Sequence, residues 1–364
     1  MSVGPTKILV VDDSALYRQS IHNVLRDVNE VRIVGVARNG VEALDKIEAM
    51  DPDLLTLDVQ MPDMDGIQLL RELNRRRLRA KAIMVSSFTS DGAQVTTEAL
   101  MEGAFDFILK PSSNDWEANR QQLRDSLGEK IAAFRESVGR AASRSRPAAP
   151  ERSAGGSLIS DTTPTPRSAC QAVIIGTSTG GPSALKLVLP KLPADLTVPV
   201  VVVQHMPAQY TTTLAKRLDD ICPLEVVEAK DGAEAAPGRI MIAPGGLQTK
   251  FDRVTSERRI RLRVTSDPPD NGVRPSVDYL IRSACEVLDG NVLAVIMTGM
   301  GRDGVKSCQQ LKAAGGYVFA QNQDDCVVYG MPKAVIQEGL ADRILPLGKI
   351  APAIVRHIKR SSRV

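Results

Sequence analysis

The chain has 364 residues, of which 43% are hydrophobic and 24% charged, and its formal net charge at pH 7 is +3. This length allows two domains, each with a hydrophobic core of its own. The small net charge gives no indication of nucleic-acid or membrane binding, which would favour a strongly basic surface. No stretch is long and apolar enough to span a membrane, and the five cysteines lack any C-x-x-C spacing. We therefore expect a cytoplasmic protein without a zinc site or a disulfide framework.

Five strand-like apolar runs alternate with helical patterns in the first part of the chain. The strands are expected at residues 7–11, 31–37, 54–59, 82–87 and 106–110, and Asn39 is expected to begin a helix. Five such units predict an α/β domain with a five-stranded parallel sheet and right-handed crossovers.

Residues 138–169 differ in composition from the rest of the chain. They are rich in Ala, Ser, Arg, Pro and Thr and contain almost no large apolar side chain. Such a segment buries too little apolar surface to offset the entropy of ordering it, so we predict a flexible linker between domains at residues 1–137 and 170–364. An irregular loop packed on one domain is the alternative.

Seven apolar runs follow the linker, separated by several helical patterns. The strands are expected at residues 172–176, 198–204, 224–229, 239–244, 259–265, 292–299 and 317–321. The pattern predicts a second doubly wound, Rossmann-like α/β domain, and we expect its sheet to have a mixed edge.

Polar residues follow four strands of the first domain. Asp12 and Asp13 follow the first strand, Asp58 ends the third, Ser86 ends the fourth and Lys110 ends the fifth. Ligands bind beyond the carboxyl ends of strands in open α/β sheets, so these side chains should meet. Three carboxylates there would repel one another unless a divalent cation such as Mg²⁺ lies among them. An aspartate beside that cation and a lysine could accept a phosphoryl group, although each residue taken singly is an ordinary loop residue.

The stretches VVDD, LDVQMPDMDG, VSS and ILKP make residues 6–135 resemble a response-regulator receiver domain, which has a flavodoxin-like fold. The resemblance implies that Asp58 is the phospho-acceptor, that Ser86 hydrogen-bonds the phosphoryl group and that Lys110 pairs with it. It further implies Mg²⁺ held by Asp12, Asp13, Asp58 and the backbone carbonyl of Gln60, with Phe107 as the switch aromatic and a cis Lys110–Pro111 peptide. Gln60 stands where this family usually has Glu, but only its carbonyl is needed.

The stretch GTSTGG at residues 176–181 allows three interpretations: a G-x-S-x-G nucleophile turn, a phosphate-binding loop or a plain small-residue turn. The G-x-G-x-x-G spacing and the P-loop lysine are absent, which disfavours the second interpretation. Of three histidines, only His205 follows a buried strand, and Asp303 lies in a glycine-rich loop after another. Ser178, His205 and Asp303 could therefore form a catalytic triad, in an order that differs from that of α/β-hydrolases. A core histidine and a turn aspartate remain the simpler alternatives.

Further motifs spread over residues 170–350 resemble the catalytic domain of chemotaxis protein-glutamate methylesterases. They are IGTSTGGPSAL, QHMPAQYTTTLAKRL, DGAEAAPGRIMIAPGG, RPSVDYLIRSA, MTGMGRDGVKSCQQLKAAGG and VVYGMPKAV. The resemblance implies Ser178 as nucleophile, His205 as general base and Asp303 as orienting acid. It also implies that the Met300 N–H donates to the oxyanion and that Thr179 flanks the nucleophile, with no cofactor at the esterase site. Gln248 stands where the family usually has a histidine.

Together, the two resemblances imply a phosphorylation-activated hydrolase. Its substrates would be methyl-esterified glutamates in the cytoplasmic domains of methyl-accepting chemoreceptors, with release of methanol, and it would also deamidate receptor glutamines. A chemotaxis histidine kinase would supply the phosphoryl group, and the unphosphorylated receiver would cover the catalytic face. The alternative is a response-regulator α/β binding module without esterase activity.

Overall fold

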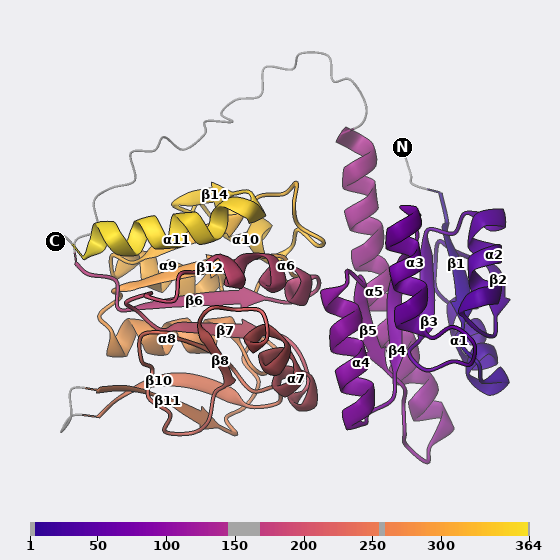
Figure 1. Ribbon diagram of the computed structural model, residues 1–364, viewed down its shortest axis with the longest axis horizontal. Coiled ribbons are helices and arrows are strands. Elements are labelled where there is room, and N and C mark those ends of the chain that lie inside the picture. The colour runs from indigo at the N-terminus through magenta and orange to yellow at the C-terminus, as the bar shows by residue number, and fades with distance from the viewer. Residues whose placement is uncertain (1–3, 145–167, 255–258, 363–364) are drawn as a thin grey trace. The chain divides into compact units, whose positions relative to one another are not determined.

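The computed structural model describes residues 4–144, 168–254 and 259–362, which form two compact units (Figure 1). Each unit has its own parallel sheet and its own buried core of aliphatic side chains. No helix within the described residues is long and apolar enough to cross a membrane.

The N-terminal unit is a five-stranded parallel sheet in the order β2-β1-β3-β4-β5. Its strands are β1 (Thr6–Val11), β2 (Val31–Ala37), β3 (Leu54–Asp58), β4 (Lys81–Ser86) and β5 (Asp106–Leu109). Its helices are α1 (Ala15–Arg26), α2 (Gly40–Met50), α3 (Gly66–Arg76), α4 (Ser90–Met101) and α5 (Trp116–Arg144). The predicted flavodoxin-like sheet is confirmed, and Asn39 caps α2 by accepting a hydrogen bond from the Glu42 N–H.

The strand order reverses between β1 and β3, which makes the carboxyl ends of these two strands the expected ligand crevice of this unit. Helices α1 and α5 contact each other, while α2, α3 and α4 form a second contacting row, so helices cover both faces of the sheet. Strands covered on both faces are buried along most of their length, and the aliphatic residues of β1, β3 and β4 are all buried.

Helix α5 continues to Arg144, beyond the predicted domain boundary at residue 137. The added residues are mostly Ala, Arg and Ser. Ala and Arg have high helix propensity, so a helix that is already nucleated propagates through them. The rest of the predicted linker, residues 145–167, lies outside the described residues.

The C-terminal unit has a seven-stranded sheet in the order β14-β13-β12-β6-β7-β9-β8. Its strands are β6 (Ala172–Thr177), β7 (Val200–Gln204), β8 (Glu225–Glu228), β9 (Arg239–Ile242), β12 (Val292–Ile296), β13 (Tyr317–Gln321) and β14 (Arg343–Leu345). All neighbouring strands are parallel, so the expectation of a mixed edge is wrong. The antiparallel pair β10 (Gln248–Val254) and β11 (Arg259–Thr265) forms a separate two-stranded sheet.

That separate sheet packs β10 against helix α8 (Val277–Val287). Buried Phe251 and Leu262 lie opposite each other in its register, whereas most neighbouring side chains are polar. A two-stranded sheet with one apolar face can pack against the domain on that face. It does not join the main sheet, whose strands are apolar on both faces. Strands β10 and β14 were not predicted, because the first is largely polar and the second has three residues.

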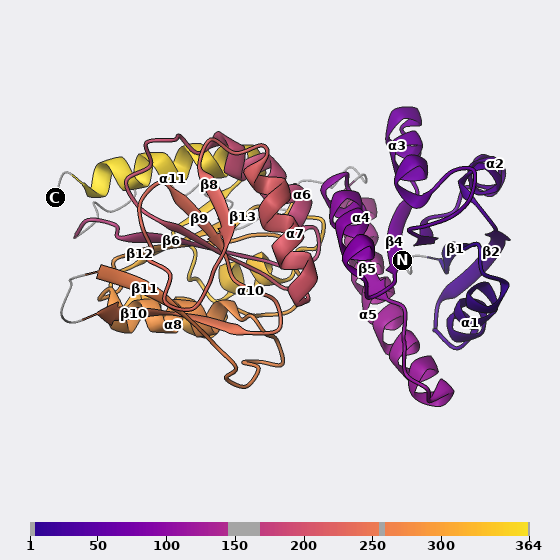
Figure 2. The ribbon, with the colours of Figure 1, turned by 60° about the horizontal axis from the view of Figure 1, so that its bottom comes forward.

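Two groups of helices enclose the main sheet of the C-terminal unit (Figure 2). Helices α6 (Gly181–Val188), α7 (Ala208–Asp219) and α11 (Leu347–Ser361) contact one another on one side, with a short 3₁₀ helix at Leu189–Lys191. On the other side, α9 (Val305–Ala313) contacts both α8 and α10 (Met331–Gln337). The sheet is therefore doubly wound, and its central strands β12, β6 and β7 end at the same edge.

Candidate active site

The three residues of the predicted triad follow the three central strands of the C-terminal sheet. Ser178 comes directly after β6, His205 directly after β7, and Asp303 closes the loop between β12 and α9. Because these strands are parallel neighbours, the fold brings residues 125 positions apart in the chain to one sheet edge, as predicted.

Ser178 occupies a tight turn between β6 and α6. Its N–H donates to the Thr298 carbonyl (3.0 Å), and its carbonyl accepts from the Gly181 N–H (2.8 Å). Gly180 has a φ of +76°, a conformation that residues with a Cβ rarely adopt. The side chain of Ser178 remains partly exposed at the start of α6, as the nucleophile-turn interpretation requires.

The side-chain amide of Gln204 holds this turn against the segment that carries His205. Its Nε2 donates to the carbonyls of Ser178 (3.0 Å) and His205 (3.3 Å), and its Oε1 accepts from the Thr177 hydroxyl (2.7 Å). A Cβ at Gly181 would overlap Gln204 Oε1, which explains why glycine occupies that position. The sequence analysis missed Gln204, although a polar amide at the end of the aliphatic run VVVVQ is a signal that could have found it.

His205 and Asp303 contact each other directly. The Nε2 of His205 lies 2.8 Å from Oδ2 of Asp303, and both side chains are largely buried. Burial alone would raise the pKa of Asp303, but the hydrogen bond and charge of His205 and two backbone N–H groups outweigh it and hold the pKa below its usual range. Because the carboxylate is ionised and can only accept, we infer that Nε2 carries the proton. The basic nitrogen of the ring is then Nδ1.

No hydrogen bond joins Ser178 Oγ to His205 among the described residues. Catalytic hydrogen bonds are often long in free enzymes and shorten only when substrate is bound. The hydrogen bonds from the Gln204 side-chain amide to the carbonyls of Ser178 and His205 nevertheless keep these two residues close together.

The loop after β12 approaches the Ser178 turn closely. A Cβ at Gly299 would lie 2.8 Å from the Ser178 Cβ, so glycine is required for this approach. Next in the chain, the Met300 N–H donates no hydrogen bond to another group in the described part of the chain. Thr179 is buried, and its carbonyl accepts from the Thr298 hydroxyl (3.0 Å). Both predicted flanking residues thus lie beside Ser178.

Gln248 is fully buried at the start of β10 and acts as a structural amide. Its Oε1 accepts from the Ser276 N–H (3.0 Å), and its Nε2 donates to the carbonyls of Pro268 (3.2 Å) and Val273 (3.4 Å). The residue therefore fastens the loop that leads into α8.

In the N-terminal unit, the predicted acidic cluster assembles around Lys110. The Nζ of Lys110 lies 2.7 Å from Oδ2 of Asp58 and 3.0 Å from Oδ2 of Asp12, and both aspartates are buried. Burial raises the pKa of Asp58 to about 6; the Lys110 ammonium opposes this rise, and the charge of Asp12 adds to it. The Lys110 ammonium therefore offsets only part of the cost of burying the charged Asp58 carboxylate.

Asp12, Asp13 and Asp58 could together hold a metal ion. One carboxylate oxygen of each lies within 4.8 Å of the others, and Asp13 is exposed to solvent. Oδ2 of Asp12 pairs with the Lys110 ammonium but accepts no hydrogen bond of good geometry, so it has coordination capacity left. Oxygen donors of this kind fit Mg²⁺. Gln60 lies in the exposed loop after β3, where its carbonyl could join them.

The remaining predicted phosphoryl-site residues are arranged around this cluster. Ser86 ends β4, and its buried hydroxyl lies 3.3 Å from the carbonyls of Ser87 and Gly92. Phe107 is half-buried in β5. The expectation of a cis Lys110–Pro111 peptide is wrong: in the described residues only Arg274–Pro275 is cis. The trans form, which X–Pro bonds favour by about 0.5–1 kcal/mol, already delivers Lys110 to Asp58.

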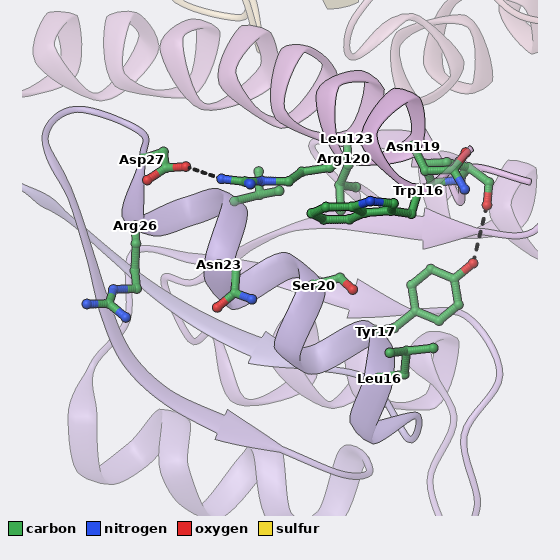
Figure 3. A pocket seen from close by; sticks show the side chains of 12 residues that line it. Leu16, Tyr17, Ser20, Asn23, Arg26, Asp27, Trp116, Asn119, Arg120 and Leu123 are labelled. Carbon is green, nitrogen blue, oxygen red and sulfur yellow. Dashed lines mark hydrogen bonds and ion pairs between the residues drawn. The ribbon is translucent and has the colours of Figure 1, made fainter. Parts of the chain in front are cut away.

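A pocket of about 720 Å³ lies between α1 and the start of α5 (Figure 3). Leu16 and Trp116 are exposed at it, and Asp27 and Arg120 pair across it at 2.9 Å. Tyr17 also lines it and reaches the acidic cluster, because its ring lies 4.5 Å below the Lys110 ammonium. Tyr17 therefore connects the pocket to the acidic cluster.

Fold and geometry together define a two-domain protein in which an acidic receiver pocket accompanies a doubly wound domain with a Ser–His–Asp cluster. The model of the CheB methylesterase family matches residues 173–354, and that of the response regulator receiver domain matches residues 8–118. The chain belongs to the CheB methylesterase family.

Individual relatives match nearly the whole chain. A protein-glutamate methylesterase/protein-glutamine glutaminase of Desulfotalea psychrophila is 44% identical over 97% of this chain and 98% of its own. A protein of the same name from Bacillus subtilis is 41% identical over 97% of this chain and 99% of its own. The crystal structure of the Thermotoga maritima CheB methylesterase catalytic domain has a TM-score of 0.50 and 42% identity, covering 51% of this chain and 97% of that domain.

Gly181→Ala is expected to destabilise the C-terminal domain by about 1–3 kcal/mol, because the new methyl group displaces the Gln204 amide. Gly348→Ala, in the first turn of α11 with open space around it, is the matched control and should change stability by less than about 0.5 kcal/mol. Urea unfolding followed by circular dichroism measures both, while fluorescence of Trp116, the only tryptophan, marks the unfolding of the receiver. Equal stability of the two variants would contradict the packing described for Gly181.

Proposed function

We propose that this protein hydrolyses the methyl esters of glutamate residues in methyl-accepting chemoreceptors and deamidates receptor glutamines, under control of its own receiver domain. The observation that carries the proposal is the His205–Asp303 hydrogen bond at the sheet edge where Ser178 also lies. The names of the relatives at 44% and 41% identity support the substrate class.

Ser178 is the nucleophile of the proposed reaction. As its Oγ attacks the ester carbonyl, Nδ1 of His205 takes the hydroxyl proton, and the Asp303 carboxylate stabilises the imidazolium that forms. The tetrahedral intermediate collapses when the imidazolium returns that proton to the methoxy oxygen, so methanol leaves and a glutamyl–serine ester remains. Water, deprotonated by the same nitrogen, then hydrolyses this ester to glutamate and restores Ser178.

The Met300 N–H is the proposed donor to the oxyanion. It lies in the loop that Gly299 brings against the Ser178 turn, and it has no acceptor within the described residues. A backbone donor fixed in this way needs no reorganisation as negative charge develops on the carbonyl oxygen. Thr179, buried and held through its carbonyl, flanks the same position.

The same residues serve for deamidation of a glutamine side chain. The carbonyl carbon and the oxyanion position are identical, and only the leaving group differs: the His205 imidazolium donates its proton to the amide nitrogen, and ammonia leaves. The esterase site needs no cofactor for either reaction.

Asp58 is the proposed phospho-acceptor. Asp12, Asp13, Asp58 and the Gln60 carbonyl would hold Mg²⁺, which would supply the positive charge that the phosphoryl oxygens require, and Lys110 would pair with the phosphoryl group. To donate to a phosphoryl oxygen, the Ser86 hydroxyl has to leave the Gly92 carbonyl in the first turn of α4. Phosphorylation therefore changes the contacts of α4, with Phe107 as the switch aromatic.

The proposed partners are the cytoplasmic domains of chemoreceptors, as substrate, and a chemotaxis histidine kinase, as phosphodonor. The receiver, residues 1–137, restrains the esterase domain, residues 170–364, until Asp58 is phosphorylated, and residues 138–169 link them. The receptor glutamates and the phosphoryl group of the kinase are both presented in the cytoplasm. The competing function, an α/β binding module without esterase activity, predicts that no methanol is released.

Ser178→Ala is expected to lower methanol release from a methylated receptor fragment at least about 1,000-fold, because no other group can form the glutamyl ester. Ser183→Ala is the matched control: its hydroxyl lies in the same segment but donates to the Gly180 carbonyl, so the variant should retain activity. Circular dichroism verifies that both variants fold. Unchanged activity of Ser178→Ala would refute the assignment, and a wild-type protein that releases no methanol would favour the binding module.

Acetyl phosphate with Mg²⁺ is expected to raise methanol release by the full chain severalfold, and Asp58→Asn should abolish the increase. Asp45→Asn, which removes an exposed carboxylate from α2, is the control and should leave the response unchanged. Because Tyr17 links Lys110 to the pocket that Trp116 lines, Trp116 fluorescence should report phosphorylation separately. A fluorescence change without an increase in activity would show that phosphorylation occurs but does not regulate the esterase.

A further inference from the structure

The carboxylate of Asp303 accepts hydrogen bonds from other groups besides His205. Oδ1 accepts from the Ser276 hydroxyl (2.9 Å) and the Asp278 N–H (3.0 Å), while Oδ2 accepts from the Val277 N–H (2.7 Å) and from His205. A carboxylate offers about four lone-pair positions, so every acceptor position of this one is used. Three of the four donors belong to the first turn of α8, including its N-cap Ser276. The orientation of Asp303 is therefore set by that helix.

A second buried carboxylate, that of Asp278, connects α8 to the N-terminus of α9. Asp278, in the first turn of α8, accepts at Oδ1 from the Ser307 N–H (2.7 Å) in the first turn of α9. The N-cap of α9 is Gly304, which has no side chain that could cap the helix, so Asp278 supplies the missing acceptor. Oδ2 of Asp278 accepts from the Asn271 side chain (2.8 Å).

Helices α8 and α9 thus exchange carboxylates at their N-termini. Asp303 directly precedes Gly304, the N-cap of α9, and binds the N-terminus of α8, while Asp278 lies in α8 and binds the N-terminus of α9. An N-terminus carries unpaired N–H groups and partial positive charge, so each helix stabilises the carboxylate that the other supplies. Ser276, Asp278 and Asp303 are all at most 5% exposed, so water cannot replace any of these bonds without opening the core.

We propose that Ser276 and Asp278 are positioning residues of the esterase site: through this reciprocal exchange they lock the Asp303 carboxylate in the orientation that holds His205. Ser276 acts directly, by donating to Oδ1, and Asp278 acts by fixing α9 behind the loop that carries Asp303. Gln248 supports the arrangement from β10, because its Oε1 accepts from the Ser276 N–H. The inference rests on the proposed catalytic role of Ser178, His205 and Asp303.

The test is steady-state methanol release by the full chain, with acetyl phosphate and Mg²⁺, over a range of methylated-receptor concentrations. Ser276→Ala is expected to lower kcat about 10-fold and to leave KM unchanged, because a less constrained Asp303 weakens proton transfer rather than receptor binding. Ser276→Thr keeps the hydroxyl and should recover most of kcat. Asp278→Asn, which keeps one oxygen for the Ser307 N–H but loses the charge, should lower kcat with the same KM.

Ser283→Ala is the matched control for Ser276→Ala. Ser283 is a buried serine of the same helix, but its hydroxyl donates to the Leu280 carbonyl (2.7 Å) and accepts from the Phe251 N–H (2.9 Å), away from Asp303. Its variant should keep the wild-type kcat even where its unfolding midpoint falls. Urea unfolding of each variant gives the folded fraction by which kcat is corrected.

Three results would overturn the proposal: a wild-type kcat for folded Ser276→Ala and Asp278→Asn, a loss in Ser283→Ala as large as that in Ser276→Ala, or no recovery in Ser276→Thr. Because Asp278→Asn probes the same exchange through another residue, it decides the question if Ser276→Ala does not fold. If Ser178→Ala loses activity while the Ser276 and Asp278 variants keep the wild-type kcat, the proposed function stands and only this inference fails. Retained activity in Ser178→Ala would remove the proposed function itself.

Discussion

The proposed esterase site depends on one contact, the 2.8 Å hydrogen bond between His205 Nε2 and Asp303 Oδ2. It decides which ring nitrogen is basic, and so which side of the imidazole has to face Ser178. The contact exists because β6, β7 and β12 are adjacent parallel strands whose carboxyl ends coincide. The surrounding polar side chains then serve it: Gln204 joins the two segments that carry Ser178 and His205, and the N-terminus of α8 orients the carboxylate.

The two domains treat a buried carboxylate in opposite ways. Asp303 has four donors, and its pKa lies below the usual range, so it stays charged and fixed. Asp58 has the Lys110 ammonium and the Val59 N–H, and burial raises its pKa to about 6. This difference suits the proposed roles, because an orienting acid has to remain still, whereas a phospho-acceptor needs unused coordination for a cation and a phosphoryl group.

Much of both sites was predictable from the sequence. Asp12, Asp58 and Lys110 follow aliphatic runs, as do Ser178 and His205, and the carboxyl ends of parallel strands meet at one edge, so their clustering follows from the pattern. Gln204, Ser276 and Asp278 were not found, because nothing in the order of residues says which buried polar side chain will meet which backbone group. The prediction of a mixed sheet edge was wrong for a similar reason. The sequence indicated that β11 is a strand, but it did not indicate that β11 pairs with the largely polar β10 outside the main sheet.

The sequence by itself determined two α/β domains, the acidic edge of the first, and the serine, histidine and aspartate of the second, because strand periodicity and residue type are local properties. Tertiary structure alone decided that Asp303 binds Nε2 of His205 and that α8 and α9 exchange carboxylates. Those features depend on packing between segments far apart in the chain. The Asp278 to Ser307 bond spans 29 residues and the His205 to Asp303 bond spans 98, separations over which no sequence periodicity operates.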